Sequence, residues 1–281
     1  MNNARIAITG SKGLLGSTLM RTLPNAVALT ADIRDEKILM TEVRALGDIS
    51  YIVHTAAKTN VAACERDPAD AHLVNGVGTQ NVVDAAHSIG VRVIYISTVS
   101  VFSGDAGNYR EADQPDPINV HNTTKVEGER AVTTYDKGTI LRLNLVGVHP
   151  DGSRGTNFME WLIDSLKAGK DINAFDDVKI NPLSNWTIAD MIASMITRGV
   201  DERILHIGSS DVRSKADIVE MVARRFPDYR GTITRTSVDS IADGVKRPKE
   251  MWLNCDYTKQ KLGIMMPTLE TEIETIFKHF V

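Results

Sequence analysis

The sequence predicts an α/β fold in which a doubly wound parallel sheet is joined to a smaller, mainly helical domain. Through the first half, short apolar runs alternate with segments whose apolar residues recur at helical spacing, which is typical of a parallel sheet covered by helices on both faces. Beyond about residue 150 the helical patterns dominate. The chain has 281 residues, 42% hydrophobic and 24% charged, so it can bury a substantial core.

The first half alternates strand and helix candidates in a regular order. The strand candidates are short apolar runs, and the helix candidates carry stripes such as Leu39, Val43 and Leu46 at helical spacing. Right-handed crossovers are expected between successive strands. We predict strands at 5–9, 26–30, 50–54, 91–97 and 139–145, and helices near 14–23, 35–46, 70–89 and 120–135.

A glycine-rich loop at 151–155 marks the predicted boundary between two domains. We therefore expect a dinucleotide-binding domain over 1–150 and a substrate-binding domain over 151–281. The apolar run 203–207 looks like a strand that rejoins the main sheet, so segments near 187–210 are expected to return to the first domain. Helices of the second half are predicted at 157–168, 187–199, 214–225 and 268–280.

Three glycines follow the first strand at the start of the first helix. Gly10 permits a tight turn, Gly13 lets the backbone approach a pyrophosphate, and Gly16 lets the helix pack closely on the strand. The helix start at Leu14 and Leu15 offers free N–H groups to an anion. Three close glycines alone also serve ordinary turns, but this strand-to-helix context predicts a Rossmann-like dinucleotide site.

Asp32 follows the first glycine by about twenty residues, the distance expected for a carboxylate that binds a cofactor ribose. Such a carboxylate repels a 2′-phosphate, so Asp32 favours NAD over NADP. Its neighbour Ile33 is a further candidate cofactor contact. Arg34 is a cation that keeps NADP open. We expect NAD or NADP as the cofactor, with a preference for NAD.

Small and hydroxyl side chains follow two of the predicted strands. Ala56, Ala57 and Lys58 come after the strand at 50–54, where small residues would let a flat cofactor approach, although tight packing explains them as well. Ser97 and Thr98 end the next strand, as ligands of a bound molecule or as turn hydroxyls.

The segment 119–129 places His121 and Lys125 on one face of a predicted helix. A lone histidine or lysine on a helix is most often a solvated polar residue. The family resemblance described next gives both a further interpretation.

The chain resembles the dTDP-4-dehydrorhamnose reductase family of the extended short-chain dehydrogenase/reductase superfamily, over nearly its whole length. The combination of motifs is far more specific than any one of them. The motifs are Gly10-x-x-Gly13-x-x-Gly16, Ala56-Ala57-Lys58-Thr59-Asn60-Val61, Ser97-Thr98, Val101-Phe102, Tyr109-x-Glu111, Lys125-x-x-Gly128-Glu129, Gly155-Thr156-Asn157-Phe158 and Arg247-Pro248.

The resemblance implies an NAD(P)-dependent reductase of a 4-keto nucleotide sugar, with Lys125 binding the nicotinamide ribose and Thr98 orienting the substrate carbonyl. The family's proton donor is a tyrosine four residues before the lysine, and here that position is His121. The change falls on the catalytic acid itself, so His121 or a water molecule would have to supply the proton.

Two alternatives remain open at this point. A neutral His121 next to Lys125 suits a base better than an acid, which would fit a nucleotide-sugar epimerase or dehydratase of the same superfamily. The other alternative is a non-catalytic, cofactor-binding regulatory subunit, since the β subunit of methionine adenosyltransferase also resembles these reductases.

Three residues of the second half are candidate substrate contacts. Arg247 could bind a diphosphate, Trp186 could stack on a ring, and Asn157 could bind a polar group, although each residue type has common structural uses.

Charge and cysteine usage limit the partners that we expect. The net charge of −4 gives no reason to expect nucleic acid or an anionic membrane as a partner, and no apolar run reaches transmembrane length. Cys64 and Cys255 lie far apart without metal-ligand spacing, so we expect free thiols, a cytoplasmic location and no metal. An exposed apolar helix face would support a homodimer.

Overall fold

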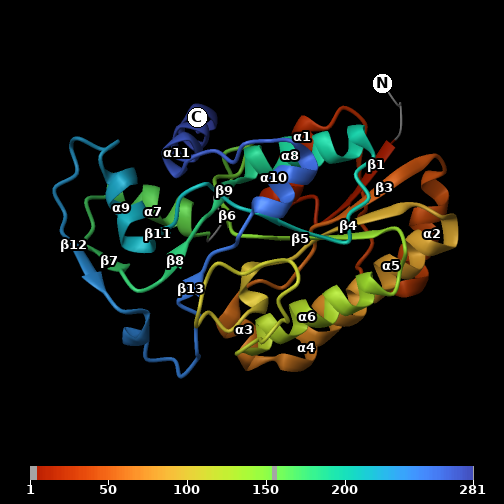
Figure 1. The fold of residues 1–281 in the computed structure, drawn as a ribbon, viewed down its shortest axis with the longest axis horizontal. Helices are drawn as coiled ribbons and strands as arrows, with labels where there is room; N and C mark the ends of the chain where they lie inside the picture. The colour runs from red at the N-terminus through yellow and green to blue at the C-terminus, as the bar shows by residue number, and fades with distance from the viewer. Residues whose placement is uncertain (1–4, 154–156, 281) are drawn as a thin grey trace.

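The computed structural model describes residues 5–153 and 157–280. The chain forms two lobes, a larger one around a central sheet and a smaller one that contains α7, α9 and α11 (Figure 1). Three residues that bear on the sequence predictions, Arg154, Gly155 and Thr156, lie outside the described residues.

The larger lobe is built on a six-stranded sheet in which every neighbouring pair is parallel, in the order β10-β5-β4-β3-β1-β2. In a parallel sheet the carboxyl ends of the strands share one edge, and the register brings Thr9 opposite His54 and His54 opposite Tyr95 at that edge. The strands are β1 (Arg5–Thr9), β2 (Ala26–Ala28), β3 (Ile49–His54), β4 (Arg92–Ile96), β5 (Gly138–Leu143) and β10 (Ile204–Ile207).

Helices cover both faces of the sheet, so the predicted doubly wound α/β class is confirmed (Figure 1). On one face, α1 (Leu14–Thr22) packs beside α8 (Asn185–Arg198), over a core that includes Leu19 and Ile188. The other face is covered by α2 (Glu36–Leu46), α5 (Gly78–Ile89) and α6 (Val120–Thr133).

The predicted helix at 70–89 is a helical run with an irregular middle. It consists of α4 (Pro68–His72), a π-helical turn at Leu73–Val77, and α5. The wider turn places Asn75 in the interior, where its side chain accepts from Lys58 N at 2.8 Å and donates to Thr124 Oγ1 at 3.0 Å. The irregular turn therefore ties the loop after β3 to α6, which is a common use of such turns near functional sites.

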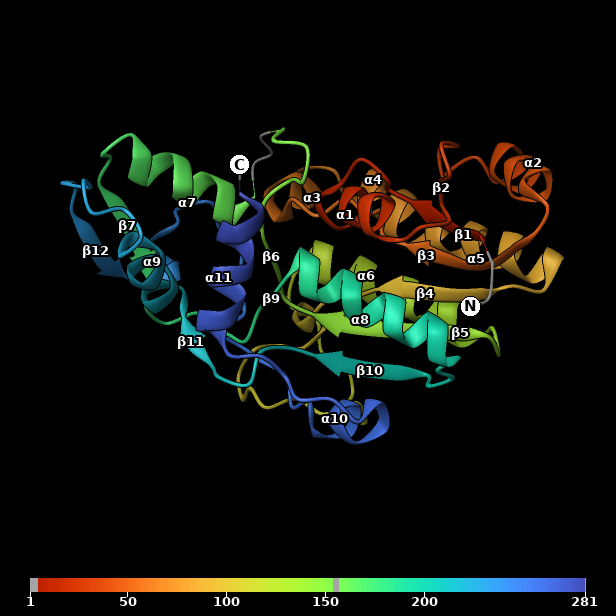
Figure 2. The same cartoon turned by 90° about the horizontal axis from the view of Figure 1, so that it is seen from above.

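The smaller lobe has a core of its own, formed by apolar residues such as Leu162, Val219 and Ile273. It contains α7 (Phe158–Lys167), α9 (Lys215–Ala223) and α11 (Leu269–His279). Figure 2 shows α7 and α9 near the short strands β7 and β12, and α11 nearer to the larger lobe. Besides the predicted helices, the lobe contains small sheets. They are formed by β11 (Arg213–Ser214), β8 (Lys179–Ile180) and β13 (Glu250–Met251), and by β12 (Ile233–Thr236) and β7 (Ile172–Phe175).

The chain crosses between the lobes more than once. After β5 it leaves the central sheet, and β6 (Leu145–Val146) pairs with β9 (Leu183–Ser184) at the junction. It then returns through α8 and β10, because β10 pairs with β5 and places Leu205 opposite Leu141. Within the described ranges, four further short helices are α3 (Val61–Arg66), the 3-10 turns η2 (Val99–Val101) and η3 (Val238–Ser240), and α10 (Asp256–Leu262).

Candidate active site

A cavity of about 460 Å³ lies at the carboxyl edge of the central sheet. It is walled by the glycine loop, the ends of β3, β4 and β5, the first turns of α6, and the residue that precedes α7. The lining residues are Gly13, Leu14, Leu15, Gly16, Thr55, Ala57, Thr59, Ile96, Ser97, Thr98, His121, Lys125, Leu143, Asn144, Leu145 and Asn157.

The glycine loop is too tight for side chains at two of its positions. Gly10 has a φ of +63°, and a Cβ there would lie 2.7 Å from the backbone nitrogen of Ala56. A Cβ on Gly16 would lie 2.1 Å from the carbonyl oxygen of Gly10, so only glycine lets α1 start this close to β1. Gly13 is the N-cap of α1 and offers no side chain to the helix start, which leaves N–H groups available for an anion.

The end of β3 is held against the glycine loop by Thr9. Its Oγ1 accepts from Thr55 N at 3.2 Å and from Ala56 N at 3.3 Å, while Thr55 Oγ1 donates to the carbonyl oxygen of Thr9 at 2.6 Å. These bonds fix the backbone at Ala56 and leave Ala57 on the cavity wall.

A buried ion pair is hydrogen-bonded to Ser97, the residue that follows β4. Glu129 accepts from Arg142 Nε at 2.9 Å and Nη2 at 2.7 Å, and also accepts from Ser97 Oγ at 2.5 Å. Ser97, Glu129 and Arg142 are all nearly inaccessible to solvent. Because the serine hydroxyl is hydrogen-bonded to this pair, Ser97 fixes the strand end. The neighbouring Thr98 faces the cavity.

The hydroxyl oxygen of Thr98 already accepts one hydrogen bond. Its Oγ1 accepts from Ser100 N at 3.1 Å, as the cap of η2. A hydroxyl that accepts in this way keeps its own hydrogen, which it can donate to a carbonyl oxygen in the cavity.

Lys125 is 4% exposed and has a backbone partner. Its Nζ donates to the carbonyl oxygen of Ile96 at 2.8 Å and lies 4.1 Å from the ring centre of Tyr95. Burial lowers the pKa of the lysine to about 7, against the opposing effect of the Glu129 carboxylate. The ammonium has three donors, so it can still bind a hydroxyl in the cavity.

His121 is 8% exposed and lies on the same wall one helical turn before Lys125. Its Nδ1 is hydrogen-bonded to Oδ1 of Asn122 at 3.1 Å. Burial lowers the pKa of His121 to about 4, although the hydrogen bond to Asn122 opposes this shift, and the positive charge of Lys125 acts in the same direction as burial. The imidazole is therefore neutral at physiological pH.

Asn157 reaches this cavity from the start of the smaller lobe. Its Oδ1 caps α7 by accepting from Glu160 N at 3.1 Å, and its Nδ2 is buried with no hydrogen-bond partner among the described residues. Six further lining residues were not predicted as site residues from the sequence: Thr55, Thr59, Ile96, Leu143, Asn144 and Leu145. Each lies at or shortly after the end of a central strand, so the rule that ligands bind at the carboxyl edge could have indicated them.

Other sequence candidates lie outside this cavity. Asp32 binds Arg34 at 2.6 Å, Arg34 binds Asp70 at 2.9 Å, and Asp70 binds Lys58 at 2.8 Å, in a chain of alternating charges. The hydrogen bond from Arg34 lowers the pKa of Asp32. Ile33 is buried, and its carbonyl oxygen accepts a hydrogen bond from the side-chain amide of Asn81.

The structure also places Trp186 and Arg247 away from the cavity. Trp186 is 7% exposed and stacks on His279 with ring centres 3.8 Å apart. Arg247 donates to both carboxylate oxygens of Asp243, at 2.8 and 2.5 Å, so its charge is already paired.

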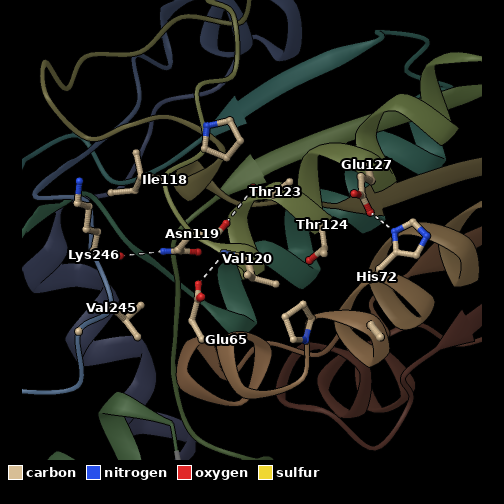
Figure 3. Close-up of a pocket in the computed structure, with 14 residues that line it drawn as sticks. Glu65, His72, Ile118, Asn119, Val120, Thr123, Thr124, Glu127, Val245 and Lys246 are labelled. Atoms are coloured by element: carbon tan, nitrogen blue, oxygen red, sulfur yellow. Dashed lines mark hydrogen bonds and ion pairs between the residues drawn. The ribbon is translucent and has the colours of Figure 1, made fainter.

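A larger, open groove of about 950 Å³ lies on another side of α6 (Figure 3). Several of its polar groups are engaged with the protein: Glu65 accepts from Val120 N, and Glu127 is paired with His72. Asn119 donates to the carbonyl oxygen of Lys246. These side chains therefore hold the walls of the groove together.

In 5–153 and 157–280, no three or more His, Cys, Asp or Glu side chains gather where they could hold a metal ion. Within the same ranges, no helix has the length and apolar character that crossing a membrane requires.

Known proteins are similar to this chain over most of their length. Residues 4–281 match the family model described as the RmlD substrate binding domain. A dTDP-4-dehydrorhamnose reductase from Sinorhizobium fredii is 30% identical, over 95% of this chain and 94% of that protein. The methionine adenosyltransferase 2 subunit beta of Bos taurus is 27% identical, over 93% of this chain and 83% of that protein.

The structural comparison agrees with the sequence comparison. The crystal structure of dTDP-4-dehydrorhamnose reductase from Bacillus anthracis in complex with NADP matches with a TM-score of 0.90 and 25% identity, over 98% of this chain and 99% of that one. The sheet order, the glycine loop and the matched residues lead to one conclusion: the chain belongs to the RmlD substrate-binding-domain family, within the extended short-chain dehydrogenase/reductase superfamily.

Proposed function

We propose that this protein is an NAD(P)-dependent reductase of a keto nucleotide sugar. The observation that carries the proposal is the single cavity in which the glycine loop, Thr98, His121 and Lys125 meet. These residues come from separate parts of the sequence, and their convergence at the carboxyl edge of the sheet suits a dinucleotide with a carbonyl substrate beside it. Membership of a family whose members include dTDP-4-dehydrorhamnose reductases supports the same activity.

The residues present fit a nicotinamide dinucleotide. The approach of Gly10 to Ala56 and the uncapped start of α1 form a cradle that side chains would fill. Gly13, Leu14 and Leu15 would hold the pyrophosphate, and Lys125 would bind the nicotinamide ribose. When bound, this cofactor supplies the hydride that reduces a carbonyl carbon.

Thr98 and His121 act on the substrate oxygen in this proposal. Thr98 donates its hydroxyl hydrogen and so orients the carbonyl. A histidine with a pKa of about 4 carries no extra proton to give at neutral pH. The neutral His121 ring therefore acts as a hydrogen-bond donor that stabilises the developing alkoxide. A water molecule supplies the proton. Asn157, whose buried Nδ2 has no hydrogen-bond partner within 5–153 and 157–280, would bind a polar group of the sugar.

We propose NADP as the preferred cofactor, which reverses the preference for NAD expected from Asp32. The carboxylate of Asp32 is paired with Arg34, and the network of Asp32, Arg34, Asp70 and Lys58 contains two cations and two anions. It therefore opposes a 2′-phosphate less than a lone carboxylate would. The B. anthracis structure in complex with NADP supports the same choice. Binding constants for NADPH and NADH, measured by fluorescence titration, test this preference.

We also propose a division into domains, a cellular location and an oligomeric state for this protein. The division into 1–150 and 151–281, with 187–210 returning to the first domain, assigns cofactor and sugar to different lobes. The chain would act in the cytoplasm, where the buried free thiols of Cys64 and Cys255 stay reduced. A homodimer is tested by sedimentation at several protein concentrations.

The deciding experiment follows nicotinamide absorbance with a panel of nucleotide 4-keto sugars. We expect NADPH oxidation by the wild-type protein and a loss of about 10²-fold or more in kcat for His121→Ala. Sugar epimerisation or dehydration without net NADPH oxidation would favour the lyase or epimerase alternative. Tight cofactor binding with turnover only in His121→Tyr would contradict the proposal and favour a regulatory subunit.

A further inference from the structure

The side chain of Asn122 is buried beside His121 and is not fully hydrogen-bonded. It is 1% exposed, its Oδ1 lies 3.1 Å from His121 Nδ1, and its Nδ2 is buried without a hydrogen-bond partner among the described residues. Its backbone is fixed independently, because Asn122 N donates to the capping oxygen of Asn119 at 3.0 Å. The contact with His121 can therefore change without any movement of α6.

The orientation of this amide decides which nitrogen of the neutral His121 ring carries the hydrogen. If Oδ1 faces the ring, Nδ1 must donate, and Nε2 is left as an acceptor. A half-turn of the amide, which barely changes its shape, points Nδ2 at Nδ1 instead. Nδ1 then accepts, and Nε2 carries the hydrogen. The half-turn also gives the buried Nδ2 a partner, and a buried N–H without a partner is rarer in proteins than a buried carbonyl without one.

The two ring forms support opposite chemistry in the cavity. Since Nδ1 is held by Asn122, Nε2 is the ring nitrogen left for a bound molecule. An Nε2 without hydrogen can only accept a proton or a hydrogen bond, as a base does. An Nε2–H can donate to a substrate oxygen beside Thr98. Lys125 is the charged side chain among the described lining residues, and its charge favours the neutral ring in either form.

We propose that Asn122 is a positioning residue that donates from Nδ2 to His121 Nδ1 and so holds the ring in its Nε2–H form, ready to donate to the keto oxygen. The inference rests on the proposed reductase function and deepens it. The amide of Asn122 would thus allow the neutral His121 ring to donate a hydrogen bond at the position where the family has a tyrosine.

The first test identifies the ring form directly and needs no activity. Protein labelled with ¹⁵N-histidine shows separate NMR signals for ring nitrogens with and without hydrogen, and the His121 signals are those missing from His121→Gln. We expect Nε2 of the wild-type protein to carry the hydrogen at neutral pH. An Nε2 without hydrogen overturns the proposal. If the wild-type protein has Nε2–H but reduces no keto sugar, the ring assignment stands and the reductase function fails.

The second test changes the partner. In Asn122→Asp the carboxylate can only accept, so it holds hydrogen on Nδ1 and raises the pKa of His121. The imidazolium of this variant still donates from Nε2, but its neutral ring does not. We therefore expect kcat of Asn122→Asp to fall by about 10²- to 10³-fold as the pH rises through the new histidine midpoint. Wild-type kcat should show no fall at that midpoint beyond the one that both proteins share through Lys125, whose pKa is about 7.

Two further variants separate this effect from general damage. Thr123→Val changes an exposed side chain on the same turn and should leave the ring signals and the pH profile of the wild-type protein unchanged. Asn122→Leu has similar size and no polar atoms, and should show a mixture of ring forms even if Asn122→Asp does not fold. A pure Nε2–H signal in both Asn122→Leu and neutral Asn122→Asp would overturn the role of Asn122.

Discussion

The ammonium nitrogen of Lys125 lies 2.8 Å from the carbonyl oxygen of Ile96, at the carboxyl end of the central strand β4. This bond joins α6 to the sheet edge and holds the charge beside the cavity. The first-turn residues of α6 are thereby fixed relative to the glycine loop on the opposite wall.

Replacing this lysine should weaken cofactor binding. In Lys125→Met the side chain keeps its apolar length but loses its donors, and hydrogen bonds from a charged group contribute about 1.5–3 kcal/mol. We expect the dissociation constant for NADPH, measured by calorimetry, to rise by the factor that corresponds to this loss of binding free energy. His121→Gln is the matched variant and should bind NADPH nearly as the wild-type protein does. Equal affinity in Lys125→Met and wild type would remove the ribose-binding role.

His121 should titrate well below an ordinary histidine. Its pKa is lowered to about 4 from 6.5, so the unfolded state binds more protons between these pH values. The contribution of the ring to stability is therefore complete above pH 6.5 and is lost as the pH falls toward 4. His121→Gln should lose less stability over this window in urea unfolding. An NMR midpoint near 6.5 for His121 would show that the ring is not buried as described.

Gly16 and Gly13 should respond differently to alanine. A Cβ at position 16 would meet the Gly10 carbonyl oxygen at 2.1 Å, whereas a Cβ at position 13 would have its nearest neighbour at 3.3 Å. We expect Gly16→Ala to lower the free energy of unfolding by about 1–3 kcal/mol, the usual cost of overpacking. Gly13→Ala should remain nearly as stable but bind NADPH more weakly. Similar unfolding curves for both variants would contradict the close packing of α1 on β1.

The ion pair between Glu129 and Arg142 should be essential for folding stability. Glu129→Gln leaves Arg142, which is 2% exposed, as a buried charge without its counter-ion. We expect a loss of about 3–5 kcal/mol in urea unfolding. Ser97→Ala removes one hydrogen bond from the same carboxylate and should cost about 1 kcal/mol. A smaller loss in Glu129→Gln than in Ser97→Ala would exclude this account of the buried pair.

Much of the secondary structure could be predicted because it follows from local patterns. The expected helix at 187–199 is α8 (Asn185–Arg198), and the expected strand at 50–54 is β3 (Ile49–His54). In contrast, the strand expected at 139–145 ends at Leu143, and Leu145 pairs with Leu183 in a different sheet. Leu141, Leu143 and Leu145 alternate with Arg142 and Asn144, so the strand-like period of two continues past Leu143 and could not show where the chain leaves the sheet.

The sequence by itself determined that the chain forms a Rossmann-like fold with a glycine loop, and it predicted that His121 occupies the position of the family's tyrosine. These features depend on residue type and spacing along the chain. Only the tertiary structure decided that Asp32 is paired with Arg34, that Trp186 and Arg247 lie away from the cavity, and that Asn122 contacts the His121 ring. Charge pairing and burial depend on which distant segments pack together, and burial sets the pKa of both His121 and Lys125.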